Sequence, residues 1–456
     1  MRLSPALRTE LGATMHLAGP LVLAGLLQMA LGATDTAFIA RLGPEPLAAA
    51  SLAVALFSVA IWALSGLSGQ VGALAAAAIG ARGPAVREVR RITRMGLWLA
   101  VASGLLAMAI CAGGERLMLL TGQDPRIAAM SGDYLNIMLW SAIPLLLSNV
   151  LRAFVSTLGR PVFATVVALL SLPLNAFGNY LLVFGAWGAP ALGLRGAAIA
   201  SVLTALTGLV MYVVAIQRDR RLRRYYLFGN FWRPDWPQIG RLMVVGIPVS
   251  ITIVAEAGLF GAAAFLMGRI GALELAAHTL ALSIASLAFQ IPFGIGQAAT
   301  IRVGYHFGAG DAAGVGRAGL VGMVLSQIFA LASAALMVGA PLWVLTPWID
   351  TDAPANAALV RLAVAYLVVA AAFQLADGLQ AVVLGALRGL QDTRTPMAFA
   401  IAGYWLVGFG LAIWLGFHTP LAGTGVWLGL AIGLLIVAVL LLVRWRRRGR
   451  LGLLAG

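Results

Sequence analysis

Three acidic residues lie inside long apolar runs of the chain, where a carboxylate must have a specific reason to be. They are Asp35, Glu256 and Asp377. A carboxylate deep in a membrane costs roughly 2.5–3.5 kcal/mol even on a permissive insertion scale, so it persists where it faces a polar cavity. We find no basic residue inside the same apolar runs to neutralise them. They predict a site for a proton, a metal cation or a cationic substrate; a protonated carboxyl bonded to a neighbouring helix is the alternative for any one.

Two asparagines add oxygen and nitrogen atoms to this set. Asn175 and Asn179 are four residues apart in an apolar run, so they share one face of a helix. Amide and carboxylate oxygens both suit a hard cation such as Na⁺. Burial favours the protonated form of a carboxylate and a bound cation favours its charged form, so the two compete for one site. A hydrogen-bond clamp between helices is the equally good alternative for the asparagines.

The elements that position these residues are predicted to be membrane-spanning helices. Of 456 residues, 61% are hydrophobic and 10% are charged, which is too little charge to cover a soluble globule. The apolar runs are about 20 residues long, the length that crosses a bilayer as a helix. We expect an all-α membrane protein with twelve spans, near residues 16–40, 47–70, 95–120, 130–151, 162–184, 196–217, 242–267, 275–298, 318–345, 360–385, 397–416 and 424–443.

The positions of the basic residues predict how the chain is oriented in the membrane. All 31 are arginines, and 25 of them fall at the termini or in the loops after even-numbered spans. Cytoplasmic loops retain positive charge, so we expect both termini in the cytoplasm and a bacterial-type inner-membrane location. The net charge of +15 therefore predicts contact with a lipid bilayer rather than with nucleic acid.

The chain also repeats itself. A shift of 228 residues matches one half to the other without a gap across about 60 residues. We expect two six-helix bundles: an N-lobe at 1–217, a cytoplasmic linker at 218–241, and a C-lobe at 242–456 with a basic tail. Both halves start in the cytoplasm, so the repeat is parallel and the substrate path lies between the lobes. The matched pairs include Pro20 with Pro248, Gln28 with Glu256, Arg41 with Arg269, Gly43 with Gly271, and Leu47–Ala49 with Leu275–Ala277.

The sequence lacks the residues that disulfides, structural metal sites, ATP binding and intramembrane catalysis require. The single cysteine, Cys111, excludes an intrachain disulfide, and no Cys/His cluster suggests a structural metal site. There is no GxxxxGK[ST] loop for ATP and no HExxH or paired-aspartate set for an intramembrane enzyme. His278 and His306 are interpreted as structural, His306 in a loop. We expect neither enzyme activity nor a cofactor.

Four segments resemble a known family. They resemble the multidrug and toxin extrusion (MATE) transporters of the NorM branch, within the wider MOP superfamily, and the resemblance extends over both halves. The last segment, with an acidic residue before GALRGLQDTR, is the most specific. The segments are DTAFIARLG at 35–43, PLNAFGNYLLVFGAWGAPALGLRGAAIAS at 173–201, LAAHTLALS at 275–283 and DGLQAVVLGALRGLQDTRTP at 377–396.

The resemblance implies antiport: a cytoplasmic organic cation, such as a drug or dye, leaves as Na⁺ or H⁺ enters. It implies an N-lobe cation site at Asp35, Asn175 and Asn179 and a C-lobe site at Glu256 and Asp377, either of which could take Na⁺. A flippase of a lipid-linked precursor is the alternative, but it would need a strongly cationic cavity. We expect a monomer whose substrate cavity includes Gln28, Thr279, Phe289 and Phe373.

Two of these cavity residues depart from the family pattern. The family often has Gln where this chain has Thr279, and some members have Tyr where it has Phe373. Both changes remove polar groups near the expected C-lobe cavity, so they affect the expected substrates and coupling ion more than the fold.

Overall fold

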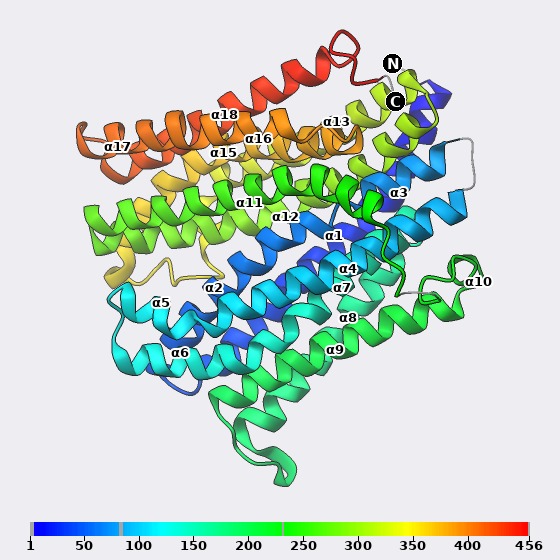
Figure 1. The fold of residues 1–456 in the computed structure, drawn as a ribbon. Coiled ribbons are helices and arrows are strands. Elements are labelled where there is room, and N and C mark those ends of the chain that lie inside the picture. The colour runs from blue at the N-terminus through cyan, green and yellow to red at the C-terminus, as the bar shows by residue number, and fades with distance from the viewer. Residues whose placement is uncertain (1–3, 82–84, 230–231, 455–456) are drawn as a thin grey trace. The chain divides into compact units, whose positions relative to one another are not determined.

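The computed structural model describes residues 4–81, 85–229 and 232–454. Within these ranges the regular structure is helical, and twelve helices are long and apolar enough to cross a bilayer. This confirms the predicted all-α, multi-pass membrane architecture (Figure 1). Of the basic residues used to predict the topology, Arg2 and Arg82 lie outside the described residues, as does part of the predicted linker, 230–231.

The chain divides into two compact units. Unit 2 is Leu23–Ser250, and unit 1 combines Met1–Val22 with Ile251–Gly456. Both breaks fall inside a long helix, two residues after Pro20 and two residues after Pro248. The breaks are separated by the same 228 residues as the sequence repeat. The predicted lobes, divided at 218–241, remain a prediction, and the compact units divide the chain at other residues.

Unit 2 consists of helices joined by short loops. The longest helices lie side by side in antiparallel pairs, such as α8 with α9 and α4 with α7 (Figure 1). Its elements are the second part of α1 (Pro5–Ala40), α2 (Pro44–Ser68), α3 (Val71–Gly80), α4 (Ala85–Ala112), α5 (Gly114–Leu120), α6 (Pro125–Met138), η1 (Leu139–Ser141), α7 (Ala142–Thr157), α8 (Val162–Phe184), η2 (Ala186–Gly188), α9 (Leu194–Arg218), α10 (Arg220–Arg223) and the first part of α11 (Trp236–Ile270).

Unit 1 is built in the same way around α12 and α15, which pack against each other along their length. Helix α18 lies against α15 on another side (Figure 1). Its elements are the first part of α1, the second part of α11, α12 (Ala272–Gly308), α13 (Ala312–Gly339), α14 (Pro341–Leu345), η3 (Pro354–Asn356), α15 (Ala357–Gly389), α16 (Arg394–Ile401), the π-helical segment η4 (Ala402–Phe409), α17 (Gly410–Phe417) and α18 (Ala422–Arg446).

Local sequence sets several helix ends. Asp124 caps α6, where its carboxylate accepts from the backbone N–H of Arg126 at 2.8 Å, and Pro125 occupies the first helical position. Helix α8 ends at Gly185, whose φ of 70° is left-handed and therefore suits glycine. These signals explain why long apolar runs end in short turns.

Glycines let the central helices of unit 1 approach closely. A Cβ added to Gly385 of α15 would lie 2.3 Å from the carbonyl oxygen of Gly296 in α12. No larger side chain fits between two backbones at that separation. In lipid there is no hydrophobic driving force for helices to associate, so close packing through small residues stabilises their contact. Helices α12 and α15 make such a contact at the centre of this unit.

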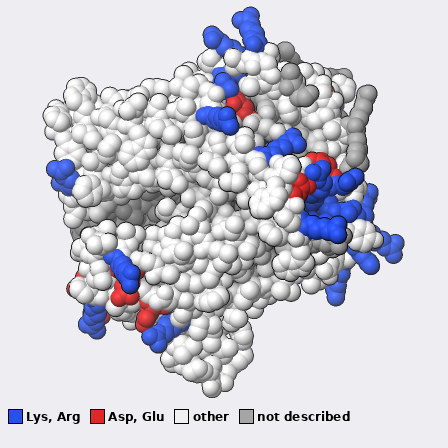
Figure 2. All heavy atoms as spheres, viewed as in Figure 1, with Lys and Arg blue, Asp and Glu red and all other residues white. Residues whose placement is uncertain are grey.

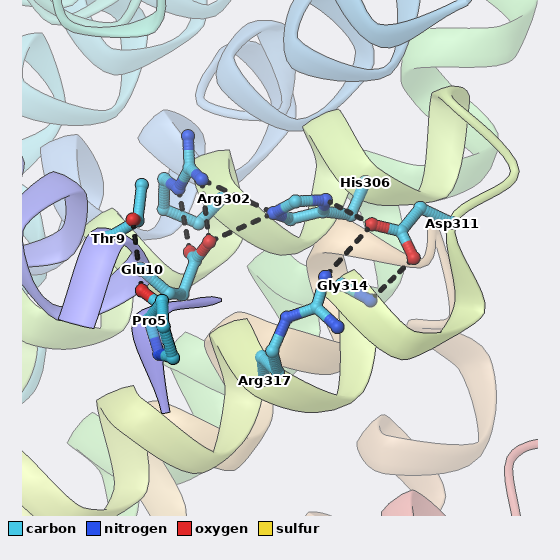
Figure 3. Close-up of polar contacts among 8 residues, drawn as sticks. All are labelled: Pro5, Thr9, Glu10, Arg302, His306, Asp311, Gly314 and Arg317. Atoms are coloured by element: carbon cyan, nitrogen blue, oxygen red, sulfur yellow. Dashed lines mark hydrogen bonds and ion pairs between the residues drawn. The ribbon is translucent and has the colours of Figure 1, made fainter. Parts of the chain in front are cut away.

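A polar cluster at one end of unit 1 holds the first part of α1 in place (Figure 3). The buried carboxylate of Glu10 accepts two hydrogen bonds of 2.7 Å from the guanidinium of Arg302. His306 lies between two carboxylates, with Nε2 3.0 Å from Glu10 and Nδ1 3.2 Å from Asp311. The same Asp311 caps α13 and pairs with Arg317 at 3.2 Å.

This cluster corrects one expectation from the sequence. His306 lies in the last turn of α12 rather than in a loop, because the helix extends to Gly308. The pKa of Asp311 is lowered, mainly by the backbone N–H of Gly314 and then by the nearby charges of His306 and Arg317. The cluster thus joins α1, α12 and α13 through charge-assisted hydrogen bonds.

Arginines gather at one end of unit 2. Figure 2 shows a dense group of basic side chains around α10, while few charged side chains are visible in the middle of the face in view. At the end with α5 and α6, basic and acidic side chains occur together: Arg126 pairs with Glu45 at 3.2 Å and Arg195 with Asp133 at 2.7 Å. Both arginines follow odd-numbered predicted spans, where the topology predicts the non-cytoplasmic face, and a carboxylate balances the charge of each.

Candidate functional site

The predicted N-lobe residues meet inside unit 2 (Leu23–Ser250). Oδ1 of Asp35 in α1 accepts hydrogen bonds from the side-chain amides of Asn175 at 2.9 Å and Asn179 at 2.7 Å. Both asparagines are fully buried in α8. The sequence placed the two amides on one helical face, and the structure brings the carboxylate to that face.

Sequence reasoning missed two further members of this site. Ser201 of α9 donates to Oδ2 of Asp35 at 2.9 Å. Tyr134 of α6 is buried, and its hydroxyl interacts electrostatically with Asp35 while making no hydrogen bond among the described residues. Ser201 ends one of the four segments that resemble the MATE family, but a single serine in an apolar helix carries no pattern of its own. The site therefore draws on four helices rather than two.

The side chains around Asp35 are compatible with two arrangements, a hydrogen-bond clamp and a cation site. As the structure stands, both amides donate to the carboxylate, which is the clamp that the sequence left open for the asparagines. An amide can be rotated so that its oxygen takes the place of its nitrogen. The buried Oδ1 of Asn179 has no hydrogen-bond partner among the described residues. With the amides rotated, carboxylate, amide and hydroxyl oxygens would face one point, the ligand set that a hard cation prefers.

The predicted C-lobe residues also lie together, in unit 1. Glu256 of α11 and Asp377 of α15 interact electrostatically with each other, and both interact with Tyr404 of the π-helical segment η4. The side-chain amide of Gln380 donates to the Tyr404 hydroxyl. Oδ1 of Asp377 and Oε1 of Gln380 are buried and have no partner in the described structure. Tyr404 and Gln380 were not predicted.

One expectation about this second site was wrong. The predicted span 360–385 ended before Arg388, so the sequence showed no positive residue near the carboxylates. The structure places Arg388 in the last turn of α15, where it interacts electrostatically with Glu256. Helix α15 extends to Gly389, beyond the apolar run from which its end was predicted. The carboxylates of the two units therefore differ, because Asp35 is held by neutral donors.

The residues predicted to line the substrate cavity are distributed over both units. Gln28 is exposed on α1 within unit 2, and the other three belong to unit 1. Thr279 bonds to its own helix at Leu275. Phe289 is partly exposed, and Phe373 is buried against two aromatic rings. Their role in substrate binding stays a prediction.

The repeat is also visible in a comparison with protein families. The sequence pattern of the MatE family matches the chain twice, at residues 20–181 and again at 248–414. The two matches begin at the two prolines, Pro20 and Pro248, that the 228-residue shift pairs. This confirms that the halves are related copies, and that Glu256 and Asp35 lie in the first helix of each copy.

Similar proteins extend over nearly the whole chain. A probable multidrug resistance protein NorM of Mesorhizobium japonicum is 41% identical over 97% of this chain and 95% of its own length. The multidrug resistance protein NorM of Burkholderia vietnamiensis is 39% identical over 97% of this chain and 94% of its own length.

Solved structures share the fold. The crystal structure of the eukaryotic MATE transporter AtDTX14 matches with a TM-score of 0.85 at 21% identity and 98% coverage of both chains. A crystal structure of MATE in the straight conformation matches with a TM-score of 0.87 at 19% identity over the whole of both chains. On the family match and the identity to these relatives, the chain belongs to the MatE family and is a membrane transporter rather than an enzyme.

Proposed function

We propose that this protein exports amphipathic, often cationic organic compounds from the cytoplasm in exchange for Na⁺ or H⁺. Relatives at about 40% identity are named multidrug resistance proteins, which supports the substrate class. Each half contributes one carboxylate site inside apolar helices, and this arrangement is the observation that carries the proposal. A coupling cation and a cationic substrate can each neutralise such carboxylates. When one is bound, the other binds less tightly.

The two sites support antiport in different ways. Asp35 is bound by three neutral donors and has oxygen atoms enough around it for a cation. Glu256 and Asp377 repel each other when both are charged, so binding of one cation between them relieves the repulsion. Exchange then follows from competition: the inward-moving ion displaces the outgoing substrate from the acidic surface. Alternating access between the predicted lobes, 1–217 and 242–456, would expose these carboxylates to either side of the membrane in turn.

The orientation belongs to the same proposal. The concentration of arginine around α10 supports a cytoplasmic location for this end of unit 2. The distribution of arginines along the sequence supports cytoplasmic termini. The paired arginines at the end with α5 and α6 fit the opposite, non-cytoplasmic face. We propose a monomeric protein of the bacterial inner membrane.

Reconstitution into liposomes tests the proposal. Purified protein is given a Na⁺ gradient or a pH gradient separately, and efflux of ethidium and of a fluoroquinolone is followed. We expect efflux to respond to at least one gradient, and Glu256→Gln and Asp377→Asn to lose this response because each keeps its size and loses its charge. Asp133→Asn, an exposed carboxylate in an ion pair, serves as the control and should transport normally.

Two results would contradict the proposal at different levels. Absence of a response to either gradient in the unmodified protein would rule out antiport of these compounds. Full gradient-driven efflux by both carboxamide variants would leave antiport standing and remove Glu256 and Asp377 from the coupling site.

A further inference from the structure

A series of buried polar atoms without partners follows α15 through the interior of unit 1. Four residues of this helix contribute one such atom each, and two residues on the flanking helices α12 and α18 contribute the rest. None of these atoms has a hydrogen-bond partner among the described residues. They belong to Tyr366, Gln374, Asp377 and Gln380 on α15, His278 on α12 and Trp427 on α18.

Three of these residues form an aromatic cluster around Trp427. The ring of His278 lies 5.4 Å from that of Trp427, and Trp427 lies 6.5 Å from Tyr366, measured between ring centroids. At most 1% of each side chain is exposed. A Cβ on Gly423 would lie 1.8 Å from the Tyr366 hydroxyl, so only glycine at that position leaves room for it. The cluster thus holds two ring nitrogens, an indole N–H and a phenol hydroxyl, all unpartnered.

The spacing along α15 connects this cluster to the acidic site. One face of the helix carries Tyr366, Gln374 and Asp377. Gln374 is eight residues after Tyr366, and Asp377 is eleven residues after it. Eleven residues of α-helix span about 16 Å. Gln374 lies between them, with its amide 3.5 Å from the Ala285 carbonyl of α12 and its oxygen unpartnered. Polar atoms therefore recur along the path from His278 to Asp377.

The fold does not require a histidine at this position. The 228-residue shift that matches Leu47–Ala49 to Leu275–Ala277 brings Ala50 onto His278. Ala50 is buried at 3% exposure in unit 2, so an alanine packs well at the equivalent place. A buried polar group without a hydrogen-bond partner destabilises the fold, and His278 presents two such atoms. Such groups are normally satisfied by internal water, which points to a hydrated interior around His278 in unit 1.

We propose that His278, Tyr366 and Trp427 bind water molecules that carry protons to Asp377, and hence that the coupling ion of unit 1 is H⁺. This inference rests on the proposed antiport. The cluster itself is unsuited to Na⁺, which needs several oxygen ligands, because it offers two ring nitrogens, an indole N–H and a single hydroxyl. A histidine can accept a proton at one ring nitrogen while it releases one from the other, and a tyrosine hydroxyl both donates and accepts.

The proton transfer balances without a further reactant. A proton that enters from outside is taken up by the first water and passed to the unprotonated ring nitrogen of His278, so that water is left neutral. The other ring nitrogen releases its proton to the next water, which leaves His278 as its other neutral tautomer until the ring reorients. That water passes a proton on, and the Asp377 carboxylate becomes a carboxyl group. The N–H of Trp427 orients a water and transfers nothing.

Other charged and titratable groups lie at both ends of the proposed proton path from His278 to Asp377. Glu274, one turn before His278 on α12, interacts electrostatically with Tyr366 and is placed to attract protons at the entrance. This is the predicted non-cytoplasmic end, since Arg269 lies close before it in sequence. Glu256, Arg388 and Tyr404 surround the far end at Asp377.

The test separates proton delivery from substrate binding. We compare His278→Ala, Tyr366→Phe and, as a matched control, His16→Ala, which removes an exposed histidine of α1. Liposomes with a pH-sensitive dye inside report proton entry during ethidium efflux, and fluorescence polarisation reports ethidium binding at fixed pH. General acid–base groups commonly contribute 10²–10⁴-fold, so we expect His278→Ala to lower proton-driven efflux at least about tenfold. Ethidium affinity should change by less than about twofold, since binding does not need the relay.

A relay also predicts rescue. The alanine variant leaves a space of the size of the missing ring, and added imidazole should restore part of the efflux in His278→Ala but not in Asp377→Asn. Tyr366→Phe keeps the packing of the ring and removes only the hydroxyl, so it tests the hydroxyl separately from the ring.

Three outcomes would overturn the proposal. One is normal proton-driven efflux in both His278→Ala and Tyr366→Phe; another is an equal loss of binding and efflux, which indicates a structural role. The third is efflux driven by Na⁺ alone in the unmodified protein, which would leave the proposed antiport intact. A failure of the unmodified protein under both gradients would instead remove the antiport itself.

Discussion

The buried ion pair between Glu10 and Arg302 offers a direct measure of what fixes the first part of α1 within unit 1. The guanidinium of Arg302 donates two hydrogen bonds of 2.7 Å to the carboxylate of Glu10, whose side chain is only 5% exposed. Glu10→Ala leaves Arg302 and His306 without their acceptor. Removal of one partner from a buried pair costs about 3–5 kcal/mol. Because Arg302 is 20% exposed and water can reach it, we expect the lower end, about 3 kcal/mol.

The assay is thermal stability in detergent, followed by size-exclusion chromatography of the protein that stays dispersed after heating. For a unit of this size, 1 kcal/mol shifts Tm by about 2–4 °C, so Glu10→Ala should lower the apparent Tm by about 6 °C or more. Asp133→Ala is the matched control, since it breaks an ion pair of equal length, 2.7 Å, in which both side chains are more than half exposed. An exposed pair contributes about 1 kcal/mol or less, so the control should lower the apparent Tm by at most about 2–4 °C.

A double substitution separates burial of charge from loss of packing. Glu10→Leu with Arg302→Met replaces the pair by apolar side chains of similar size, which is often neutral or stabilising for buried pairs. We therefore expect the double variant to recover most of the lost stability. The reasoning is refuted if Glu10→Ala is no less stable than Asp133→Ala, or if the double variant is less stable than Glu10→Ala.

Two further predictions concern the site in unit 2 and the packing of unit 1. Ser201→Ala removes a donor to the α1 carboxylate and should slow gradient-driven efflux about tenfold, because a hydrogen bond to a charged group contributes about 1.5–3 kcal/mol. Thr204→Val, whose hydroxyl bonds only to its own helix in the described structure, should transport normally; equal rates for the two would contradict the assignment. Gly385→Ala forces a Cβ against the Gly296 carbonyl and should lower the apparent Tm, since overpacking costs about 1–3 kcal/mol. Gly12→Ala, with open space around it, should not lower it, and a similar loss in both would refute the close-packing argument.

The spans and the acidic residues were predictable because the membrane imposes a local rule. A chain in lipid must satisfy its own backbone hydrogen bonds, so apolar runs of sufficient length become helices. The cost of a charge in lipid is also local, which singled out Asp35, Glu256 and Asp377. The 228-residue repeat is a property of the sequence itself, and the two family matches confirm it.

Other features depend on which helices pack together, and hydropathy carries no information on that choice. Ser201 and Tyr134 are single polar residues in apolar helices, and they join the Asp35 site because of the way α6 and α9 pack in unit 2. The helix end at Arg388 was misplaced because an apolar run stops before the helix does.

The sequence by itself thus determined twelve helices in two related halves and three carboxylates within them. Only the tertiary structure decided that α1 divides between two units, with Glu10 bonded to Arg302 inside unit 1 and Asp35 bonded to α8 inside unit 2. Hydropathy is summed along the chain, whereas a partner across a helix interface is selected by the fit of side chains that are distant in sequence. For this reason the carboxylates could be named from the sequence, and their partners only from the fold.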